Sequence, residues 1–361
     1  MSDNLRQYRA IRDALRQAYP GALQGQGARH LTTLAALISG IVASKSTQLP
    51  KVAAKVPNGT KPESRVKRFA RWLDNERILE EVYFLPYAEF LLAHLALETL
   101  VLVMDGSVVG CGCAALMLHV IYKGRALPLA WRVRHGPKGH FPEELHIALV
   151  ELVRACLPAG TSVVFLGDGE FDGTTLQKTL NEAGWCYACR TAQSTVAMWD
   201  GATFRLDTLG ACSKPGTLIE LKEVKLTRDA YGPVMVLSCW AKGYQEPLYV
   251  VSNMDTAEEA CRYYQKRFRI ETFFSDQKSR GFHIHKSHIA ESQRLARLLI
   301  AACLAYIWII YLGALCEKEG WRAIIHRRKR CDLSLFQLGL RILEHFLNEE
   351  LPIPVQFHIT I

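Results

Sequence analysis

Acidic residues are scarce in this sequence of 361 residues, which has 35 Asp and Glu against 44 Lys and Arg and a formal net charge of +9. That balance favours a polyanionic partner. The sequence also lacks internal repeats and low-complexity segments, which excludes solenoid architectures and long disordered tracts. The N-terminal stretch MSDNLRQYRA lacks the apolar region of a secretory signal. We therefore expect a cytoplasmic protein whose 11 cysteines are reduced thiols.

Long uncharged apolar runs are also rare, and the exception covers residues 298–316. Its 19 residues reach the length of a membrane span. Because the run contains several alanines and no second run accompanies it, we expect a central buried helix and no membrane partner; a membrane span is the alternative. The content of 49% hydrophobic and 22% charged residues is typical of a globular chain with two domains, or with one large domain and an insertion.

Two cysteine pairs, a CxC at Cys111 and Cys113 and a CxxC at Cys186 and Cys189, are candidates for a zinc site. Both pairs lie in apolar runs that resemble strands, where cysteine is a common small core residue. We therefore expect these four thiols to be core residues, with zinc binding as the alternative.

Two aspartates follow short apolar runs. Asp105 comes after LETLVLVM, and Asp168 comes after SVVFLG. Runs of this length and composition, followed by an acid and a glycine, predict buried strands. A carboxylate at the end of a buried strand is unfavourable unless it is paired or bound to a metal ion. Asp before Gly also caps turns, which is the ordinary alternative for either residue alone.

A third acid belongs to a polar helix face. The run from Thr256, TAEEACRYYQKRFRIETFFSDQKSRG, predicts one helix. At about 100° per residue, Tyr264, Arg267, Glu271 and Lys278 fall within roughly 60° of arc. Such a face suits an exposed ion-paired surface, or a metal ligand flanked by groups that hold phosphate. Together the three acids could hold two divalent cations about 3.5–4 Å apart, the arrangement used to attack phosphodiesters.

The N-terminal region, residues 1–95, has the apolar spacing of helices and a cluster of basic residues. Short helices with a basic excess and tight turns resemble helix-turn-helix DNA-binding proteins. A solvated helical face is the alternative, and both stay open on this evidence. The candidate DNA-binding residues are Arg65, Lys67, Arg68 and Arg71.

The middle of the sequence alternates strand and helix patterns. Three sequential antiparallel strands are predicted over residues 97–135, followed by helix, strand, helix and strand. The order βββαβαβ, with acids after the first and fourth strands, is that of a ribonuclease-H-like α/β fold. Residues 191–254 contain further strand patterns and predict a β-rich insertion. We therefore expect a helical N-terminal DNA-binding domain (1–95), a catalytic domain (96–316) that contains this insertion, and a helical C-terminal tail (317–361).

These residues together resemble a known family. Tyr264, Arg267, Glu271 and Lys278 match the Tyr-x2-Arg-x3-Glu-x6-Lys signature of DDE transposases of bacterial insertion sequences, in the branch named after insertion sequence four. Asp105 in DGS, Asp168 in LGDGEFDG, the β-rich insertion and the segment PESRVKRFARWLDN also match that branch. The resemblance implies cut-and-paste movement of an insertion sequence by hydrolysis and strand transfer, through a hairpin end.

The resemblance also implies roles for these residues. Asp105, Asp168 and Glu271 would be catalytic and would bind two Mg²⁺ ions, for which Mn²⁺ can substitute. The phosphate-binding residues would be Tyr264, Arg267 and Lys278. Trp240, in the insertion, is a candidate for stacking against a flipped base, with a strand core residue as the alternative.

The partners implied are double-stranded DNA with terminal inverted repeats and target DNA, bound by a homodimer that is associated with the nucleoid when on DNA. Two other hypotheses share the same residues. One is a two-metal nuclease without strand transfer, and the other is a catalytically inactive DNA-binding relative.

Overall fold

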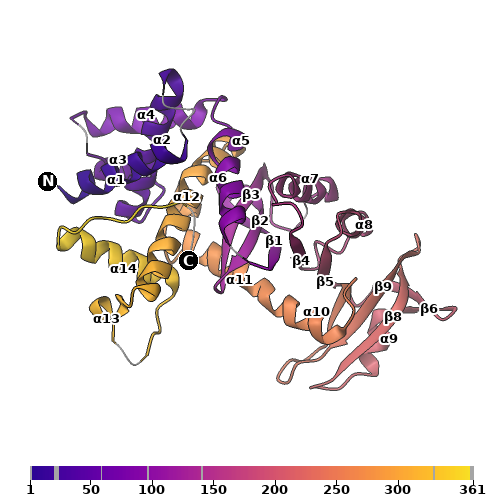
Figure 1. Ribbon diagram of the computed structural model, residues 1–361. Helices are drawn as coiled ribbons and strands as arrows, with labels where there is room; N and C mark the ends of the chain where they lie inside the picture. The colour runs from indigo at the N-terminus through magenta and orange to yellow at the C-terminus, as the bar shows by residue number, and fades with distance from the viewer. Residues whose placement is uncertain are drawn as a thin grey trace.

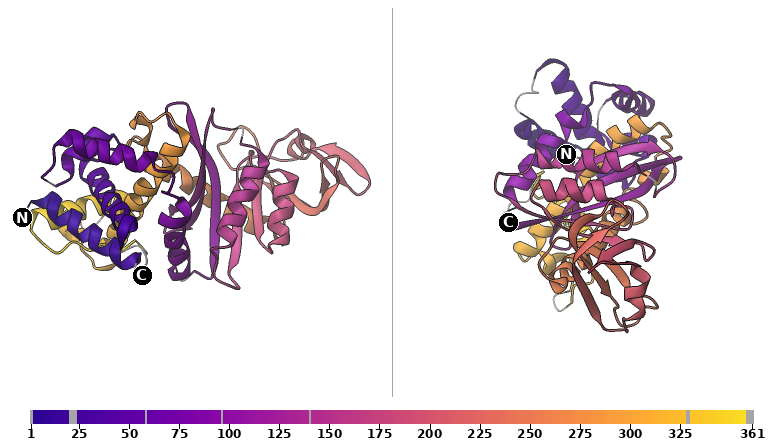
Figure 2. Two further views of the ribbon diagram at one scale, coloured as in Figure 1. Left: turned by 90° about the horizontal axis from the view of Figure 1, so that it is seen from above. Right: turned by 90° about the vertical axis from the view of Figure 1, so that its right-hand side faces the viewer.

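The computed structural model describes residues 2–19, 24–57, 59–95, 97–139, 141–327 and 330–357. Figure 1 shows a helical layer at one end, a large sheet with helices beside it in the middle, and a strand-rich extension at the other end. The two termini lie in or beside the helical layer, which therefore contains both the first and the last helices (Figure 2).

In the described parts of the first 98 residues, every element is a helix, as the sequence predicts. Proline occupies the first turn of three of them, where its missing N–H has no intrahelical partner to lose. Close approach of two helices depends on Gly40, because a Cβ there would lie 2.5 Å from Val52 Cγ1. The helices are α1 (Asp3–Ala18), α2 (Gly25–Ser44), α3 (Leu49–Lys55), α4 (Pro62–Asp74), α5 (Glu80–Tyr83) and α6 (Leu85–His94).

The central elements follow in the predicted order βββαβαβ. The first three strands are antiparallel neighbours, which confirms the predicted meander, and the first strand also pairs in parallel with the fourth, which pairs in parallel with the fifth. The elements are β1 (Thr99–Gly110), β2 (Cys113–Tyr122), β3 (Arg125–His135), α7 (Glu143–Arg154), β4 (Ser162–Gly167), α8 (Thr174–Glu182) and β5 (Cys186–Thr191).

The segment predicted as a β-rich insertion, residues 191–254, contains most of the remaining strands. Its last strand pairs with β5, so the described strands form one ten-stranded sheet in the order β3-β2-β1-β4-β5-β10-β9-β8-β6-β7. The insertion thus extends the central sheet at one edge. Its elements are β6 (Val196–Trp199), β7 (Ala202–Arg205), α9 (Leu206–Ala211), β8 (Leu218–Leu226), β9 (Tyr231–Cys239) and β10 (Leu248–Ser252).

The helix predicted from Thr256 is not continuous. It begins as α10 (Ala257–Tyr264), tightens into the 3₁₀ turn η2 (Gln265–Phe268), and continues as α11 (Arg269–Gln277). Apolar periodicity cannot distinguish this turn from α-helix, because 3₁₀ and α segments share nearly the same backbone angles. The prediction of one uninterrupted helix was therefore wrong.

The uncharged run at 298–316 lies in α12 (Ser292–Lys318), which contacts α2, α14 (Leu335–Asn348) and β3. Among the described residues it is the one helix long and apolar enough to cross a membrane, and 94% of its most apolar window is buried inside the protein. Two glycines bring α12 and α14 together, since a Cβ on Gly313 would lie 2.0 Å from Leu335 O and one on Gly339 1.9 Å from Ile309 O. The predicted central buried helix is confirmed. The remaining elements are η3 (Ile284–Lys286) and α13 (Arg322–Ile325).

Candidate active site

The two aspartates meet at one edge of the parallel strand pair. The last paired residues of β1 and β4 are Val103 and Leu166, so Asp105 and Asp168 each lie two residues further along. The sequence predicted Asp105 at the end of its strand. This prediction was wrong, because β1 continues past Asp105 to Gly110 beside β2. The neighbouring strand β4 ends at Gly167, so Asp105 faces the turn that contains Asp168.

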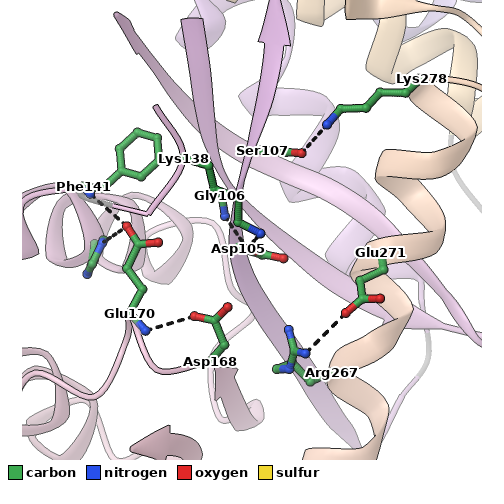
Figure 3. Close-up of polar contacts among 11 residues, drawn as sticks. Asp105, Gly106, Ser107, Lys138, Phe141, Asp168, Glu170, Arg267, Glu271 and Lys278 are labelled. Carbon is green, nitrogen blue, oxygen red and sulfur yellow. Dashed lines mark hydrogen bonds and ion pairs between the residues drawn. The ribbon is translucent and has the colours of Figure 1, made fainter. Parts of the chain in front are cut away.

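Asp105 is buried, with 3% of its surface exposed. Its Oδ1 accepts hydrogen bonds from the Gly106 N–H at 2.7 Å and lies 3.0 Å from Lys138 Nζ. Burial raises the pKa of Asp105, the Asp168 charge raises it further, and the Lys138 ammonium opposes both. The centre of the candidate site is formed by the carboxylates of Asp105 and Asp168 and by the ammonium of Lys138 (Figure 3).

The turn after β4 is fixed by its own acids. Asp168 Oδ1 accepts the Glu170 N–H at 3.0 Å, and Glu170 Oε1 accepts the Phe141 N–H at 2.8 Å. Burial raises the pKa of Glu170, and the neighbouring Asp168 and Asp105 charges raise it further, against the Phe141 hydrogen bond. His146 Nε2 lies 4.0 Å from Glu170 Oε1, and burial lowers the pKa of His146 to about 4. A neutral imidazole therefore backs this turn near neutral pH.

The four signature positions do not form one exposed helix face. Tyr264 and Arg267 are buried, at 4% and 8% exposed, whereas the Glu271 side chain is 57% exposed. Arg267 Nη2 contacts Glu271 Oε1 at 3.3 Å, and its guanidinium lies over the Phe268 ring at 4.5 Å. Burial raises the pKa of Tyr264, against the Arg267 charge. The side chains of this segment therefore differ in burial, with Tyr264 and Arg267 inside the protein and Glu271 at the surface.

Lys278 is the C-cap residue of α11 and reaches the neighbouring strand. Its Nζ donates to Ser107 Oγ at 2.6 Å, two residues along β1 from Asp105. Burial lowers the pKa of Lys278, and the Lys138 charge lowers it further, against Asp105. Arg267 also acts on Asp105, whose pKa it lowers. The structure therefore brings Lys278 and Arg267 to the same side of the sheet as Asp105 (Figure 3).

The donor set fits a divalent cation in part. Asp105 and Asp168 offer carboxylate oxygens, which suit Mg²⁺ or Mn²⁺, at one sheet edge. Glu271 comes from the adjacent helix but is turned toward Arg267. Among the described residues, no group of three His, Cys, Asp or Glu side chains is close enough to hold a metal ion. Asp105 and Asp168 therefore share one sheet edge, whereas Glu271 pairs with Arg267 on the adjacent helix.

Sequence reasoning missed two residues of this site. Lys138 lies in the loop GPKG, where nothing in its spacing from Asp105 signals contact. Phe141 ends the same loop, and its ring packs on Gly106, where a Cβ would lie 2.9 Å from Phe141 Cε2. Both contacts depend on how the loop after β3 folds back over β1, which no local pattern encodes.

The N-terminal candidates lie on α4 and differ in their surroundings. Arg65 donates to Ala53 O at 2.8 Å and to Val56 O, so it caps α3 and is not a free DNA contact. Lys67 is exposed. Arg68 and Arg71 line a surface hollow of about 560 Å³ that also contains Arg29, His30 and Trp72.

Trp240 and the cysteine pairs lie outside the acidic site. Trp240 directly follows β9, is half-buried, and donates through Nε1 to Tyr244 O at 2.9 Å. It is therefore not an interior strand residue. All four thiols are free. Cys113 and Cys189 are buried as expected, but Cys111 and Cys186 are exposed, so the expectation of four core residues was wrong for these two.

A family model and a solved structure are similar to this chain. The family model of the transposase DDE domain matches residues 100–308, more than half of the chain. No curated protein matches. A cryo-EM structure of a piggyBac transposase synaptic complex with hairpin DNA is similar at 14% identity and a TM-score of 0.43, covering 71% of this chain and 55% of that one. The chain thus spans about half the length of that transposase. From the family match, this chain belongs to the transposase DDE domain family.

Proposed function

We propose that this protein is a DNA transposase that cuts double-stranded DNA at terminal inverted repeats and joins the ends to target DNA. Members of the family are DNA-cutting and strand-transferring enzymes that generally use divalent metal ions. The observation that carries the proposal is the strand register, which sets Asp105 level with Asp168 at one sheet edge, beside two cations from the signature segment.

The chemistry follows from the donor set. Asp105 and Asp168, joined by Glu271 after it leaves Arg267, would hold two Mg²⁺ ions or Mn²⁺ in their place. When bound, such ions supply Lewis-acid activation of a water or a DNA 3′-hydroxyl and stabilise the leaving oxygen. Lys278 binds a DNA phosphate beside Asp105, and Arg267, released from Glu271, binds a second one.

Tyr264 has a different part in this proposal from the one the resemblance implies. Because it is buried beneath the site, it holds the Arg267 guanidinium, which lies 5.9 Å from its ring centroid. A direct phosphate contact would need the phenol at the surface. Tyr264 is therefore a positioning residue for Arg267.

The finer assignment is to the insertion-sequence-four branch, with a ribonuclease-H-like core. The strand order β3-β2-β1-β4-β5, antiparallel for three strands and then parallel, supports that core. In this proposal the chain acts in the cytoplasm as a homodimer on DNA, the N-terminal helices bind the inverted repeat, and the ends pass through a hairpin. Trp240 takes the flipped base in that step, which its half-buried place after β9 allows.

A second candidate function is that of an inactive DNA-binding relative. The observation that favours it is that the Glu271 side chain is 57% exposed and pairs with Arg267. The two candidates differ in whether Glu271 is needed for any chemistry.

The test uses a labelled fragment that carries the inverted repeat flanking this gene, incubated with the protein and Mg²⁺. Glu271→Gln keeps the size of the side chain and is the matched control. Cleavage at the repeat boundary with joined products, lost in the control, supports the transposase. Nicking without joining indicates a nuclease. Specific binding without Mg²⁺-dependent cleavage indicates the inactive relative and refutes the proposal.

A further inference from the structure

Lys138 contacts Asp105 although it belongs to no sequence signature. It lies in the loop between β3 and α7, and its Nζ is 3.0 Å from Asp105 Oδ1. The lysine side chain is 47% exposed, whereas the aspartate side chain is 4% exposed. The ammonium thus enters the site from the solvent side and contacts one of the two carboxylate oxygens of Asp105 (Figure 3).

The loop that carries Lys138 is anchored on both sides of this contact. Upstream it continues from β3. Downstream, Phe141 donates its N–H to Glu170 Oε1 at 2.8 Å, and its buried ring packs on Gly106. Arg134 adds a cation–π contact at 4.6 Å to the Phe141 ring centroid. Because these contacts fix the ends of a short segment beside Asp105, Lys138 can move its long side chain while its backbone stays at the site.

The charges around Lys138 define what it can bind. Its ammonium pairs with Asp105 at 3.0 Å, and the Lys278 ammonium donates at 2.6 Å to Ser107 Oγ, two residues from Asp105 on the same strand. A divalent cation on Asp105 would take the oxygen that Lys138 now contacts. The displaced ammonium would then lie between a metal ion and Lys278, a place that suits an anion with several oxygens.

We propose that Lys138 is a substrate-positioning residue that neutralises Asp105 until a divalent cation displaces it, and that then binds a phosphate oxygen of DNA together with Lys278. This role rests on the proposed function, since it needs both a metal ion on Asp105 and a DNA substrate. It predicts two opposite consequences of removing the lysine, which a structural role alone would not produce.

The experiment measures Mn²⁺ binding and DNA binding separately. Lys138→Met keeps the length of the side chain without its charge. Lys178→Met is the matched control, because Lys178 is 67% exposed on α8 and contacts Glu182 at 3.9 Å. In DNA-free protein, Mn²⁺ titrated by electron paramagnetic resonance should bind Lys138→Met roughly two- to fivefold more tightly, the scale of a half-exposed ion pair. Lys178→Met should match the wild type.

DNA binding should shift the other way. With Ca²⁺ in place of Mg²⁺, Lys138→Met should bind the inverted-repeat fragment more weakly, and the slope of log affinity against log salt should fall by about 1. Lys138→Arg keeps the charge and should retain wild-type Mn²⁺ and DNA binding. Thermal unfolding of each variant checks that the fold is unchanged, and Lys138→Gln, which is polar and uncharged, replaces Lys138→Met if that variant does not fold.

Two results would overturn the proposal, for different reasons. In the first, Asp105→Asn weakens Mn²⁺ binding, but Lys138→Met binds Mn²⁺ no more tightly than the wild type. This result would refute the role of Lys138 and leave the metal site supported. Wild-type Mn²⁺ binding that Asp105→Asn does not weaken would refute the metal site of the proposed function, and the role of Lys138 with it.

Discussion

His119 should make the stability of this protein fall steeply in mild acid. It lies on β2, is 0% exposed, and packs against Phe273 of α11 with 4.4 Å between ring centroids. Burial lowers its pKa to about 3. In the unfolded chain the imidazole takes a proton near pH 6.5, but in the folded protein it stays neutral until the pH approaches 3. The stability it contributes is therefore full above pH 6.5 and is lost as the pH falls.

The size of the effect follows from the proton difference between the two states. Below pH 6.5 the unfolded state binds one more proton at His119, so the free energy of unfolding decreases by about 1.4 kcal/mol per pH unit. Between pH 6.5 and 4.5 this amounts to about 3 kcal/mol, a large part of a typical domain's stability. His146, whose pKa burial lowers to about 4, acts in the same direction over the same range.

A variant separates His119 from the other titrating groups. Asp276 changes the stability in the opposite direction. Burial raises its pKa to about 6, so its contribution to the free energy of unfolding increases as the pH falls from about 6 to 3.8. His119→Leu keeps a similar volume and removes only one titration. Urea unfolding followed by circular dichroism at pH 7.5, 6.5, 5.5 and 4.5 gives two curves. The difference between the two free energies of unfolding should be nearly independent of pH above pH 7. Below pH 6 it should change by about 1.4 kcal/mol per pH unit. Parallel curves would refute the assignment of His119 as a buried neutral histidine.

Three further predictions concern Asp276, Gly106 and Trp240. Asp276→Ala should lower the free energy of urea unfolding by about 3–5 kcal/mol, because it leaves the Arg125 guanidinium, which Asp276 contacts at 2.9 Å, without its ion-pair partner. Replacing Arg125 with Met and Asp276 with Leu in one variant should cost less. Equal losses in the two variants would contradict this. Gly106→Ala should destabilise by about 1–3 kcal/mol in thermal unfolding, because the new methyl would meet Phe141 at 2.9 Å; an unchanged midpoint would show that the ring moves freely. Trp240→Ala should reduce hairpin formation by about five- to 150-fold relative to first-strand nicking, the value of one stacked base; equal loss of both products on a gel would exclude base stacking.

The elements that could be predicted from the sequence are those with a strong local pattern. The strands before Asp105 and Asp168 are uninterrupted apolar runs, and they occur where predicted. The buried helix at 298–316 was also predicted, because a long run without charges and without a second span favours a core helix. The parallel pairing of β1 with β4, which brings the two aspartates to one sheet edge, was not predicted from the strand patterns themselves.

Other features depend on contacts that no local pattern contains. The burial of Arg267 is set by packing against other elements, so the sequence of its own segment could not predict it, whereas its ion pair with Glu271 was one of the two interpretations of the polar face. The contact of Lys138 with Asp105 depends on a loop that folds back over β1. Arg65 was predicted to bind DNA from its charge alone, yet its direction toward the carbonyl groups of α3 is set by helix packing.

The most direct test of the central claim is single-turnover cleavage of the inverted-repeat fragment in Mg²⁺ by Asp105→Asn, Asp168→Asn and the double variant. Asp172→Asn is the matched control, because Asp172 lies in the same turn but accepts a hydrogen bond from Thr191 Oγ1 at 2.6 Å. If Asp105 and Asp168 act as one metal-binding unit, each single variant should lose about as much activity as the double variant. Asp172→Asn should retain cleavage. Substantial cleavage by Asp105→Asn, or losses that simply multiply in the double variant, would contradict a shared metal site.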